Sequence, residues 1–231
     1  MKLEISIMKY LATIMLSMSI FYLVTCVPSI CLGQKEKCGI VYPINVKKYN
    51  ELSSVIWYGW DFSNFKICDQ NVYNYLIKDQ YIPEWITRMN KLFSENEVRR
   101  DLDKQNFTSD LKTIQYLYKS KNFKDFLTFD KYELPIDSIK AIVKRYPLSQ
   151  KSGAGFVIII ENLNKPERYV TGYLTFFDVA TKEVLWATKM KGEPGGKWGA
   201  ELYYRNGILE LYPYFFRKYY NKTIKNANTS Q

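Results

Sequence analysis

Residues 156–190, FVIIIENLNKPERYVTGYLTFFDVATKEVLWATKM, contain three consecutive strand patterns. The run at 156–160 is continuously apolar, which is typical of a central strand buried on both faces. Residues 169–177 then alternate between polar and apolar, as expected for a strand whose side chains point to opposite faces. A turn at 178–182 leads to a further strand over 184–190. The stretch therefore predicts an antiparallel meander of three strands.

Further patterns flank this meander on both sides. Residues 55–68 are rich in β-branched and aromatic types and predict another strand, with either a bulge or a close backbone approach at Gly59. Helical patterns cover three segments: 71–103 with a break near Ile82-Pro83, 135–146, and about 199–220. Residues 109–118 fit either a helix or a strand. The chain is thus predicted to be α+β, with an antiparallel sheet of about four to five strands and helices packed mainly on one face.

The N-terminal segment has the features of an export signal. Positions 10–33 carry no charge, and their apolar part follows directly after Lys9. A basic start, an apolar stretch and small residues at the exit describe a secretory signal, so we expect cleavage before Gln34. The expected organisation is a signal peptide over 1–33, a single α+β domain over 34–220 and a polar tail over 221–231.

Two alternatives to simple cleavage remain open. Residues 23–26, Leu-Val-Thr-Cys, resemble a bacterial lipobox, which would make Cys26 a lipidated N-terminus. The uncharged segment is also long enough to span a bilayer as an uncleaved anchor. In all three cases we expect an exported protein, either periplasmic or secreted. It would be attached to a membrane only if Cys26 is lipidated or the N-terminal segment stays uncleaved.

Removal of the leader leaves two of the four cysteines, Cys38 and Cys68. In an oxidising compartment such a pair is a candidate disulfide. The alternative is two buried thiols, and the sequence does not decide between them because it does not give the separation of the two Cα atoms.

The chain contains no histidine, and its formal net charge is +10. The absence of histidine excludes Ser–His–Asp and Cys–His nucleophile systems as well as imidazole metal sites. We therefore expect no metal and no cofactor. Any enzyme would have to use carboxylates, Lys, Tyr or Cys.

Asp61 is the candidate carboxylate, because it lies inside an apolar strand. Burial there would raise its pKa and suit it to acid–base chemistry. The sequence favours a plainer role, in which Asp61 faces solvent or accepts a backbone hydrogen bond at a bulge. No second carboxylate stands at a motif-like spacing from it.

The loop from Gly192 to Gly199 connects a strand to a helix, and Gly195, Gly196 and Lys197 form a candidate anion-binding loop within it. The spacing is not that of a phosphate-binding Walker loop, which has four residues before Gly-Lys and then Ser or Thr. The favoured alternative is a tight connection in which glycine supplies a positive φ.

A candidate basic surface lies near the C-terminus, where cations alternate with aromatic residues. Its cations are Arg217, Lys218, Lys222 and Lys225, and its aromatics are Tyr212, Tyr214, Phe215, Phe216, Tyr219 and Tyr220. Such a mixture binds anionic lipid or glycan, whereas nucleic acid is not expected as a partner of an exported protein. The favoured alternative is an amphipathic helix whose aromatics pack on the sheet.

Three phrases carry a resemblance to a known family. They are Trp60-Asp61-Phe62-Ser63, the hairpin sequence FFDVATKEVL at 176–185, and the Gly192…Gly195-Gly196 loop before an aromatic-rich helix. Over roughly residues 50–220 the chain resembles an uncharacterised family of exported Gram-negative envelope proteins. The resemblance implies a periplasmic or outer-membrane-associated domain without an assigned activity or catalytic residues.

The function favoured by the sequence is a non-catalytic envelope binding or assembly domain. It would hold a partner, such as an envelope protein, an anionic lipid or a glycan, on the Tyr/Thr face of the sheet or on the C-terminal helix. One alternative is a histidine-free hydrolase or transferase that uses Asp61 with a second acid. The other is a binder of membrane surfaces or polyanions.

Overall fold

The computed structural model of this 231-residue chain describes residues 39, 41–42, 45–69, 76–102, 104, 106–196 and 199–221, without the side chains at 41, 42, 217 and 218. Internal contacts divide the chain into Met1–Lys37 and Cys38–Gln231, and every element below belongs to the second unit. The predicted signal peptide lies outside the described residues. Within the described part, no helix is both long and apolar enough to cross a membrane.

The predicted three-stranded meander is confirmed. Strands β5 (Ala154–Asn164), β6 (Tyr169–Asp178) and β7 (Val184–Gly192) pair antiparallel in chain order. Arg168 and Lys182, in the two connecting turns, adopt positive φ angles of 55° and 58°. Tight hairpin connections commonly need a left-handed residue to match the twist of the strands.

The complete sheet differs from the prediction in strand number and direction. Among the described residues it has seven strands, in the order β1 (Val41–Tyr42), β7, β6, β5, β2 (Ser54–Asp61), β4 (Asn106–Ser109), while β3 (Lys66–Cys68) pairs with β5. Strand β2 runs parallel to both β5 and β4, and β3 also runs parallel to β5. The α+β class is confirmed, but the sheet is mixed. Hydrophobic alternation shows which face of a strand is buried, but it does not show which strand pairs with it or in which direction.

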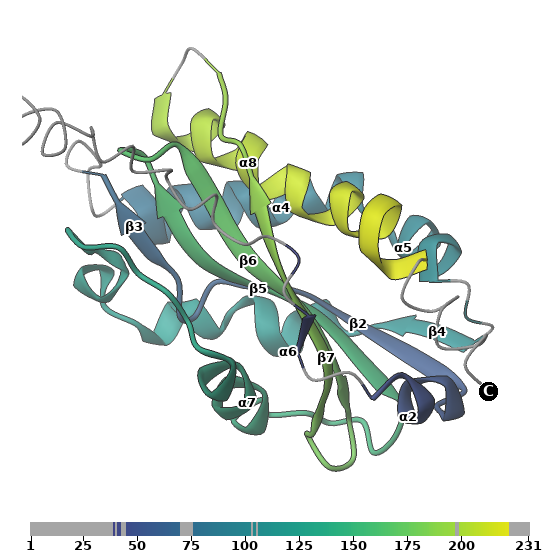
Figure 1. The fold of residues 1–231 in the computed structure, drawn as a ribbon. Coiled ribbons are helices and arrows are strands. Elements are labelled where there is room, and N and C mark those ends of the chain that lie inside the picture. Colours follow the sequence, from purple (N-terminus) through teal and green to yellow (C-terminus); the bar gives the residue numbers. More distant parts are fainter. Residues whose placement is uncertain are drawn as a thin grey trace, which may run out of the picture. The chain divides into compact units, whose positions relative to one another are not determined.

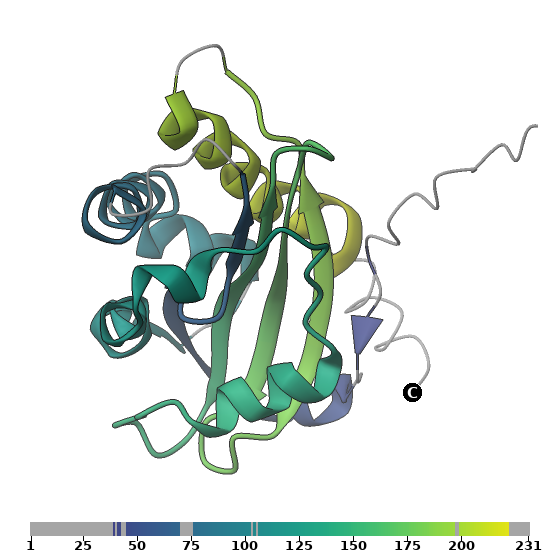
Figure 2. The same cartoon turned by 90° about the vertical axis from the view of Figure 1, so that its left-hand side faces the viewer.

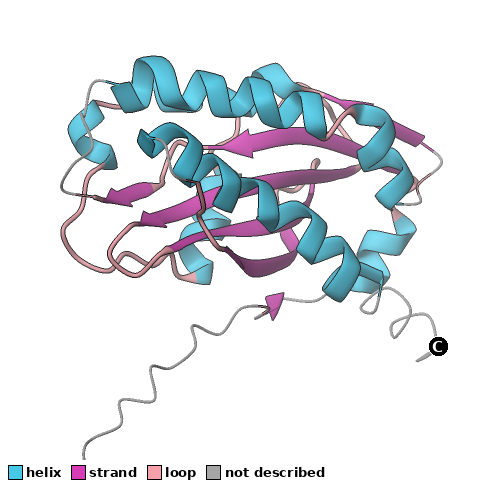
Figure 3. Cartoon of the chain, turned by 90° about the horizontal axis from the view of Figure 1, so that it is seen from above, coloured by secondary structure: helices cyan, strands magenta, loops and turns pink. Residues whose placement is uncertain are grey.

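Helices cover both faces of the sheet, so the expectation that they lie mainly on one face was wrong. The helical elements are α2 (Val46–Glu51), η1 (Ile77–Tyr81), α4 (Ile82–Leu92), α5 (Glu95–Leu102), α6 (Leu111–Gln115), η2 (Leu117–Ser120), η3 (Phe123–Phe126), α7 (Ile136–Lys144), α8 (Gly199–Phe215) and η4 (Phe216–Tyr220). Figure 1 shows α8, α4 and α5 above the sheet, with α6 and α7 below it. Seen from above in Figure 3, α8 and the α4–α5 pair lie across the strands. Strands that are apolar on both faces need cover on both.

Aromatic rings fill the core between the sheet and α8. Phe176 stacks on Phe156 and Trp186, with ring centroids 4.4 and 5.2 Å apart. Phe215 and Tyr220 close over Trp186 from the helical side, at 5.4 and 5.7 Å. A second and largely aliphatic cluster packs on the opposite face of the sheet, which is the face that α7 covers (Figure 2).

Two prolines set helix geometry differently from the sequence expectation. The predicted break at Ile82-Pro83 is absent, because η1 continues directly into α4 and Pro83 occupies the first turn of α4. Pro83 has no N–H to donate, and the helix changes from the π-helical to the α-helical pattern beside it. Pro213 lies inside α8, and the π-helical η4 follows. Residues 109–118 form α6, capped by the side chain of Asp110, and the start of η2.

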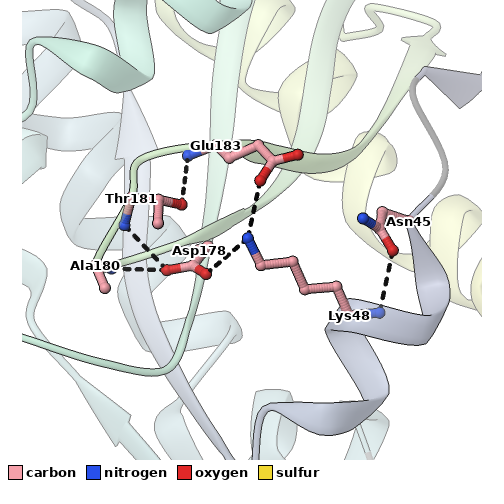
Figure 4. Close-up of polar contacts among 6 residues, drawn as sticks. All are labelled: Asn45, Lys48, Asp178, Ala180, Thr181 and Glu183. Carbon is pink, nitrogen blue, oxygen red and sulfur yellow. Dashed lines mark hydrogen bonds and ion pairs between the residues drawn. The ribbon is translucent and has the colours of Figure 1, made fainter.

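Lys48 fastens α2 to the turn between β6 and β7 (Figure 4). Its Nζ lies 3.1 Å from the carboxylate of Asp178 and 2.8 Å from that of Glu183. Asp178 also accepts the N–H groups of Ala180 and Thr181 at 2.8 and 3.1 Å. Burial opposes ionisation of Asp178, but these N–H donors and the ammonium together lower its pKa. One carboxylate therefore closes the turn and holds the helix.

Candidate functional site

Asp61 ends β2, and its side chain is buried. The carboxylate accepts the N–H of Ser63 at 2.7 Å and the hydroxyl of Tyr146 at 2.7 Å. Burial raises the pKa of Asp61, and the bonds from Ser63 and Tyr146 offset part of that rise. The contact with Ser63 also stops the strand, since an Asp side chain that accepts a bond two residues on forms a turn. The predicted strand over 55–68 is accordingly divided into β2 and β3.

A bulge, one of the two features expected at Gly59, is present, and it decides which face Asp61 occupies. The register of β2 shifts between Trp57 and Trp60, where Gly59 has a φ of +80°. The extra residue reverses the alternation, so Asp61 points to the α7 side instead of sharing the face of Trp57. A Cβ at Gly59 would lie 1.9 Å from the side-chain nitrogen of Gln115.

A second buried carboxylate, Glu161, lies on the same face. Its Oε2 is 2.9 Å from Nζ of Lys189, and 0% and 11% of the two side chains are exposed. Its Oε1 accepts the backbone N–H of Leu134 at 2.6 Å. Burial raises the pKa of Glu161, while the charge of Lys189 and the bond from Leu134 lower it in part. The sequence reasoning missed this pair, although a charged residue directly after the apolar run 156–160 was a signal for it.

Residues 130–135 cross this face as an extended segment, which we call the strap. Both backbone groups of Leu134 form hydrogen bonds to side chains. Its N–H donates to Glu161, and its carbonyl accepts the hydroxyl of Tyr173 at 2.8 Å. The carbonyl of Tyr132 accepts the side-chain amide of Asn162 at 3.1 Å. The polar residues predicted for this side of β6 are therefore buried inside the domain: Tyr169, Thr171, Tyr173 and Thr175.

The two carboxylates belong to neighbouring strands of the sheet, β2 and β5. Asp61 pairs with Ile159, and Glu161 lies two residues further along β5 on the same face. A buried acid with a raised pKa is a candidate for acid–base chemistry. Both side chains are 0% exposed, however, so a substrate reaches neither unless the covering side chains move.

The glycine-rich loop uses its own donors internally. The N–H of Glu193 donates to the carboxylate of Glu210 at 2.8 Å, and the N–H of Gly195 donates to a carbonyl of α8 at 3.2 Å. Gly196 has a φ of +121°, as expected if the loop is simply a tight connection between the strand and the helix. Lys197 lies outside the described residues, so the anion-binding role of Gly195, Gly196 and Lys197 stays a prediction.

The C-terminal aromatics pack largely into the domain. Tyr212, Phe215, Phe216 and Tyr220 are buried, and Tyr214 and Tyr219 are partly buried. This packing is the alternative that the sequence favoured. The side chains of Arg217 and Lys218, and the residues Lys222 and Lys225, lie outside the described part, so the basic surface itself stays a prediction.

Cys68 lies at the end of β3, where its thiol is 3.8 Å from the carbonyl oxygen of Phe129. Burial raises the pKa of this thiol, and the carboxylates of Glu167 and Asp69 add to the rise. Cys38 lies outside the described residues, so the disulfide between Cys38 and Cys68 stays a prediction.

A groove of about 530 Å³ lies between the ends of α4, α5 and α8. Its lining residues are Leu92, Phe93, Glu97, Arg100, Asp101, Tyr212, Pro213, Phe216 and Asn221. The hydroxyl of Tyr212 donates to Asp101 at 3.1 Å, and the rings of Phe93 and Tyr212 are 4.4 Å apart. The groove is thus lined by aromatic rings, and the hydroxyl of Tyr212 in it already has a hydrogen-bond partner.

Large apolar side chains are exposed at four described positions, and three of these belong to one segment. Tyr116, Phe123 and Phe129 are 45%, 36% and 83% exposed, whereas the fourth, Leu92, lies in the groove. The same segment carries five lysines: Lys112, Lys119, Lys121, Lys124 and Lys131. We call these three rings and five lysines the aromatic–lysine face; the same segment also carries two exposed carboxylates, Asp125 and Asp130. The sequence reasoning missed it, although the lysines and rings alternate there as clearly as they do near the C-terminus.

The segment that carries this face is held against β3. Phe126 turns inward and stacks on Phe65, with ring centroids 4.9 Å apart. The N–H of Thr128 donates to the carbonyl of Ile67 at 3.0 Å. Phe123 and Phe129 lie three residues to either side of Phe126 and remain exposed, so the packing leaves a ring on each side of this anchor.

Among the described residues, no group of three or more His, Cys, Asp or Glu side chains is placed to hold a metal ion. Comparison with known proteins adds no relationship to this geometry. No family model, no curated protein and no solved structure matches this chain.

Proposed function

We propose that this chain is an exported, non-catalytic envelope domain that associates with a membrane surface through the aromatic–lysine face. The observation that supports the proposal is the gathering of exposed rings and lysines on one segment, with Phe129 83% exposed. Aromatic rings are favourable at the headgroup level of a bilayer, and lysines are attracted to anionic lipids. The leader predicted at 1–33, which is uncharged from position 10 onward, supports an origin at the same membrane.

The closed state of the two acids supports a non-catalytic role. Asp61 is enclosed by Ser63 and Tyr146, and Glu161 by Lys189 and the strap. Each carboxylate already has the partners that a buried acid needs for stability. Their arrangement is therefore accounted for by folding alone.

Binding to vesicles tests the proposal. The processed chain is recovered from its host, its N-terminus is sequenced, and flotation is measured with phosphatidylcholine vesicles with and without phosphatidylglycerol. We expect binding that increases with phosphatidylglycerol and decreases with salt, because the lysine contribution is screened. Phe129→Ser should weaken binding by roughly ten- to a hundredfold, since a buried Phe ring contributes roughly 1.5–3 kcal/mol.

Leu92→Ser is the matched control, because Leu92 is an exposed apolar residue outside the face. It should leave vesicle binding unchanged. Equal losses in Leu92→Ser and Phe129→Ser, or no vesicle binding by the wild type, would rule out the face as the contact. The same sequencing tests the exported origin, for which Gln34 is the expected first residue; an intact Met1 in the cytosol would exclude it.

A second candidate function is a hydrolase or transferase that uses Asp61 and Glu161. The specific observation in its favour is that the two carboxylates lie on the same face of paired strands and that burial raises both pKa values. We expect Asp61→Asn to leave turnover of ester, glycoside and phosphate substrates unchanged. A loss of turnover with the fold retained would favour the enzyme over the membrane-associated domain.

A further inference from the structure

A small hollow opens where η1 and the start of α4 meet η2. Its volume is about 340 Å³, and it is lined by Lys78, Asp79, Pro83, Tyr118 and Lys119. Lys119 also belongs to the aromatic–lysine face, so the hollow adjoins that face. Two cations against one carboxylate leave the hollow with a net positive charge.

Tyr118 is the unusual residue in the lining of this hollow, and its buried hydroxyl meets a ligand there only when the neighbouring side chains move. Its side chain is 1% exposed, and the hydroxyl has no hydrogen-bond partner among the described residues. Burial raises the pKa of Tyr118, so the hydroxyl keeps its proton and is a donor at neutral pH. A buried donor without an acceptor is costly, which indicates a ligand that supplies an oxygen.

The two lysines are held in place by other groups. Nζ of Lys78 donates to the carbonyl of Lys121 at 2.6 Å, and Nζ of Lys119 lies 4.6 Å from the ring centroid of Tyr116. An ammonium group has three donors, so each retains further N–H groups for an anion. Two ammonium groups and one hydroxyl around a hollow of this size are suited to the oxygens of a phosphate group.

We propose that this hollow binds the phosphate of a phospholipid headgroup. The inference rests on the proposed function, because the lipid reaches the hollow when the aromatic–lysine face lies on a bilayer. Lys119 belongs to both surfaces and its ammonium lies over the ring of Tyr116, so that exposed ring meets the headgroup layer beside the bound phosphate. Asp79 also lines the hollow, where its charge adds to the rise in the pKa of Tyr118 and disfavours ligands of high negative charge.

Tyr118→Phe is the decisive variant, because it keeps the buried ring and removes only the hydroxyl. It should weaken binding to phosphatidylglycerol vesicles about tenfold, as expected for a hydrogen bond to a charged group. Its urea unfolding midpoint should not fall, since the hydroxyl has no partner among the described residues of the folded chain. The double variant Lys78→Gln/Lys119→Gln should lose more, at about fivefold for each lysine. Lys47→Gln/Lys151→Gln, two exposed lysines elsewhere, is its matched control.

Inorganic phosphate serves as the second probe, measured by calorimetry on the same proteins. If Tyr118→Phe abolishes phosphate binding but leaves vesicle binding intact, the ligand is free phosphate and the lipid assignment is overturned. If vesicles bind wild type and Tyr118→Phe equally and Phe129→Ser still weakens binding, the headgroup site is wrong while the proposed function stands. If no vesicles bind the wild type, both fail together.

Discussion

The ammonium of Lys189 and the carboxylate of Glu161 form an ion pair at 2.9 Å beneath the strap, on the face opposite α8. Removal of one member leaves the other charge buried without a partner. Lys189→Met should therefore lower the free energy of unfolding by about 3–5 kcal/mol, measured by urea denaturation. The double variant Glu161→Gln/Lys189→Met should recover much of this loss, because it removes both charges and keeps an acceptor for Leu134. A double variant as unstable as Lys189→Met alone would contradict this account.

The buried carboxyl of Asp61 gives the protein a specific pH dependence. Because its pKa in the folded state is raised above 3.8, the folded chain holds this proton more tightly than the unfolded chain does. The stability contributed by the group is fully present below pH 3.8 and is lost as the pH rises through the folded pKa. The side chain introduced by Asp61→Asn does not titrate, so the stability of this variant relative to wild type should increase between pH 3.8 and the folded pKa. The increase is about 1.4 kcal/mol for each tenfold difference in proton affinity between the folded and unfolded chains. Urea unfolding at a series of pH values measures this, and a constant difference between the two proteins would show that the pKa is not raised.

Gly192 and Gly195 provide a matched pair of substitutions in the same loop. A Cβ at Gly192 would lie 1.9 Å from the carbonyl oxygen of Gly207, whereas a Cβ at Gly195 meets nothing within 4 Å. Gly192→Ala should destabilise the protein by about 1–3 kcal/mol, because α8 has to move away from β7. Gly195→Ala should change the thermal midpoint very little. Equal effects of the two substitutions would mean that α8 does not approach the loop as closely as described.

Gly59→Ala tests the bulge that turns Asp61 toward α7. The substitution places a Cβ against Gln115 and also puts alanine at a φ of +80°, so we expect a loss of roughly 2–4 kcal/mol from strain and crowding together. Gln115 exchanges two hydrogen bonds with Asn90, which limits how far its side chain can withdraw. In Gly59→Ala/Gln115→Ala the crowding is relieved and the backbone strain remains. A double variant restored to the stability of Gln115→Ala would show that φ imposes no cost.

Much of the fold follows from local sequence pattern, and its long-range pairing does not. The meander over 154–192 and helix α7 were predicted, because periodicity and turn residues are properties of short windows. Strand β4 was missed, since the four residues Asn106–Ser109 are mostly exposed and carry no alternation. The parallel pairing of β2 with β5 joins segments about a hundred positions apart, and no local pattern specifies it.

The sequence pointed to one residue of the candidate site, but it did not show which other residues the fold brings near it. Asp61 was found because a carboxylate within an apolar strand is conspicuous. Glu161 and Lys189 were missed, because each resembles a polar residue at the exposed end of a strand until the strap is seen to cover them. The hydroxyl of Tyr118, which lacks a partner among the described residues, has no sequence signature at all, since any tyrosine can find a partner.

The parallel contact between β2 and β5 also bears on how the chain acquires its structure. In the described part of the chain, strand β2 pairs with residues that follow it by about fifty and about a hundred positions, so the sheet cannot close until the second half of the chain is available. Such distant pairings make folding slow. A polypeptide that threads through a translocation pore with its first half leading would consequently remain unfolded until most of it has emerged, which is the condition that threading requires.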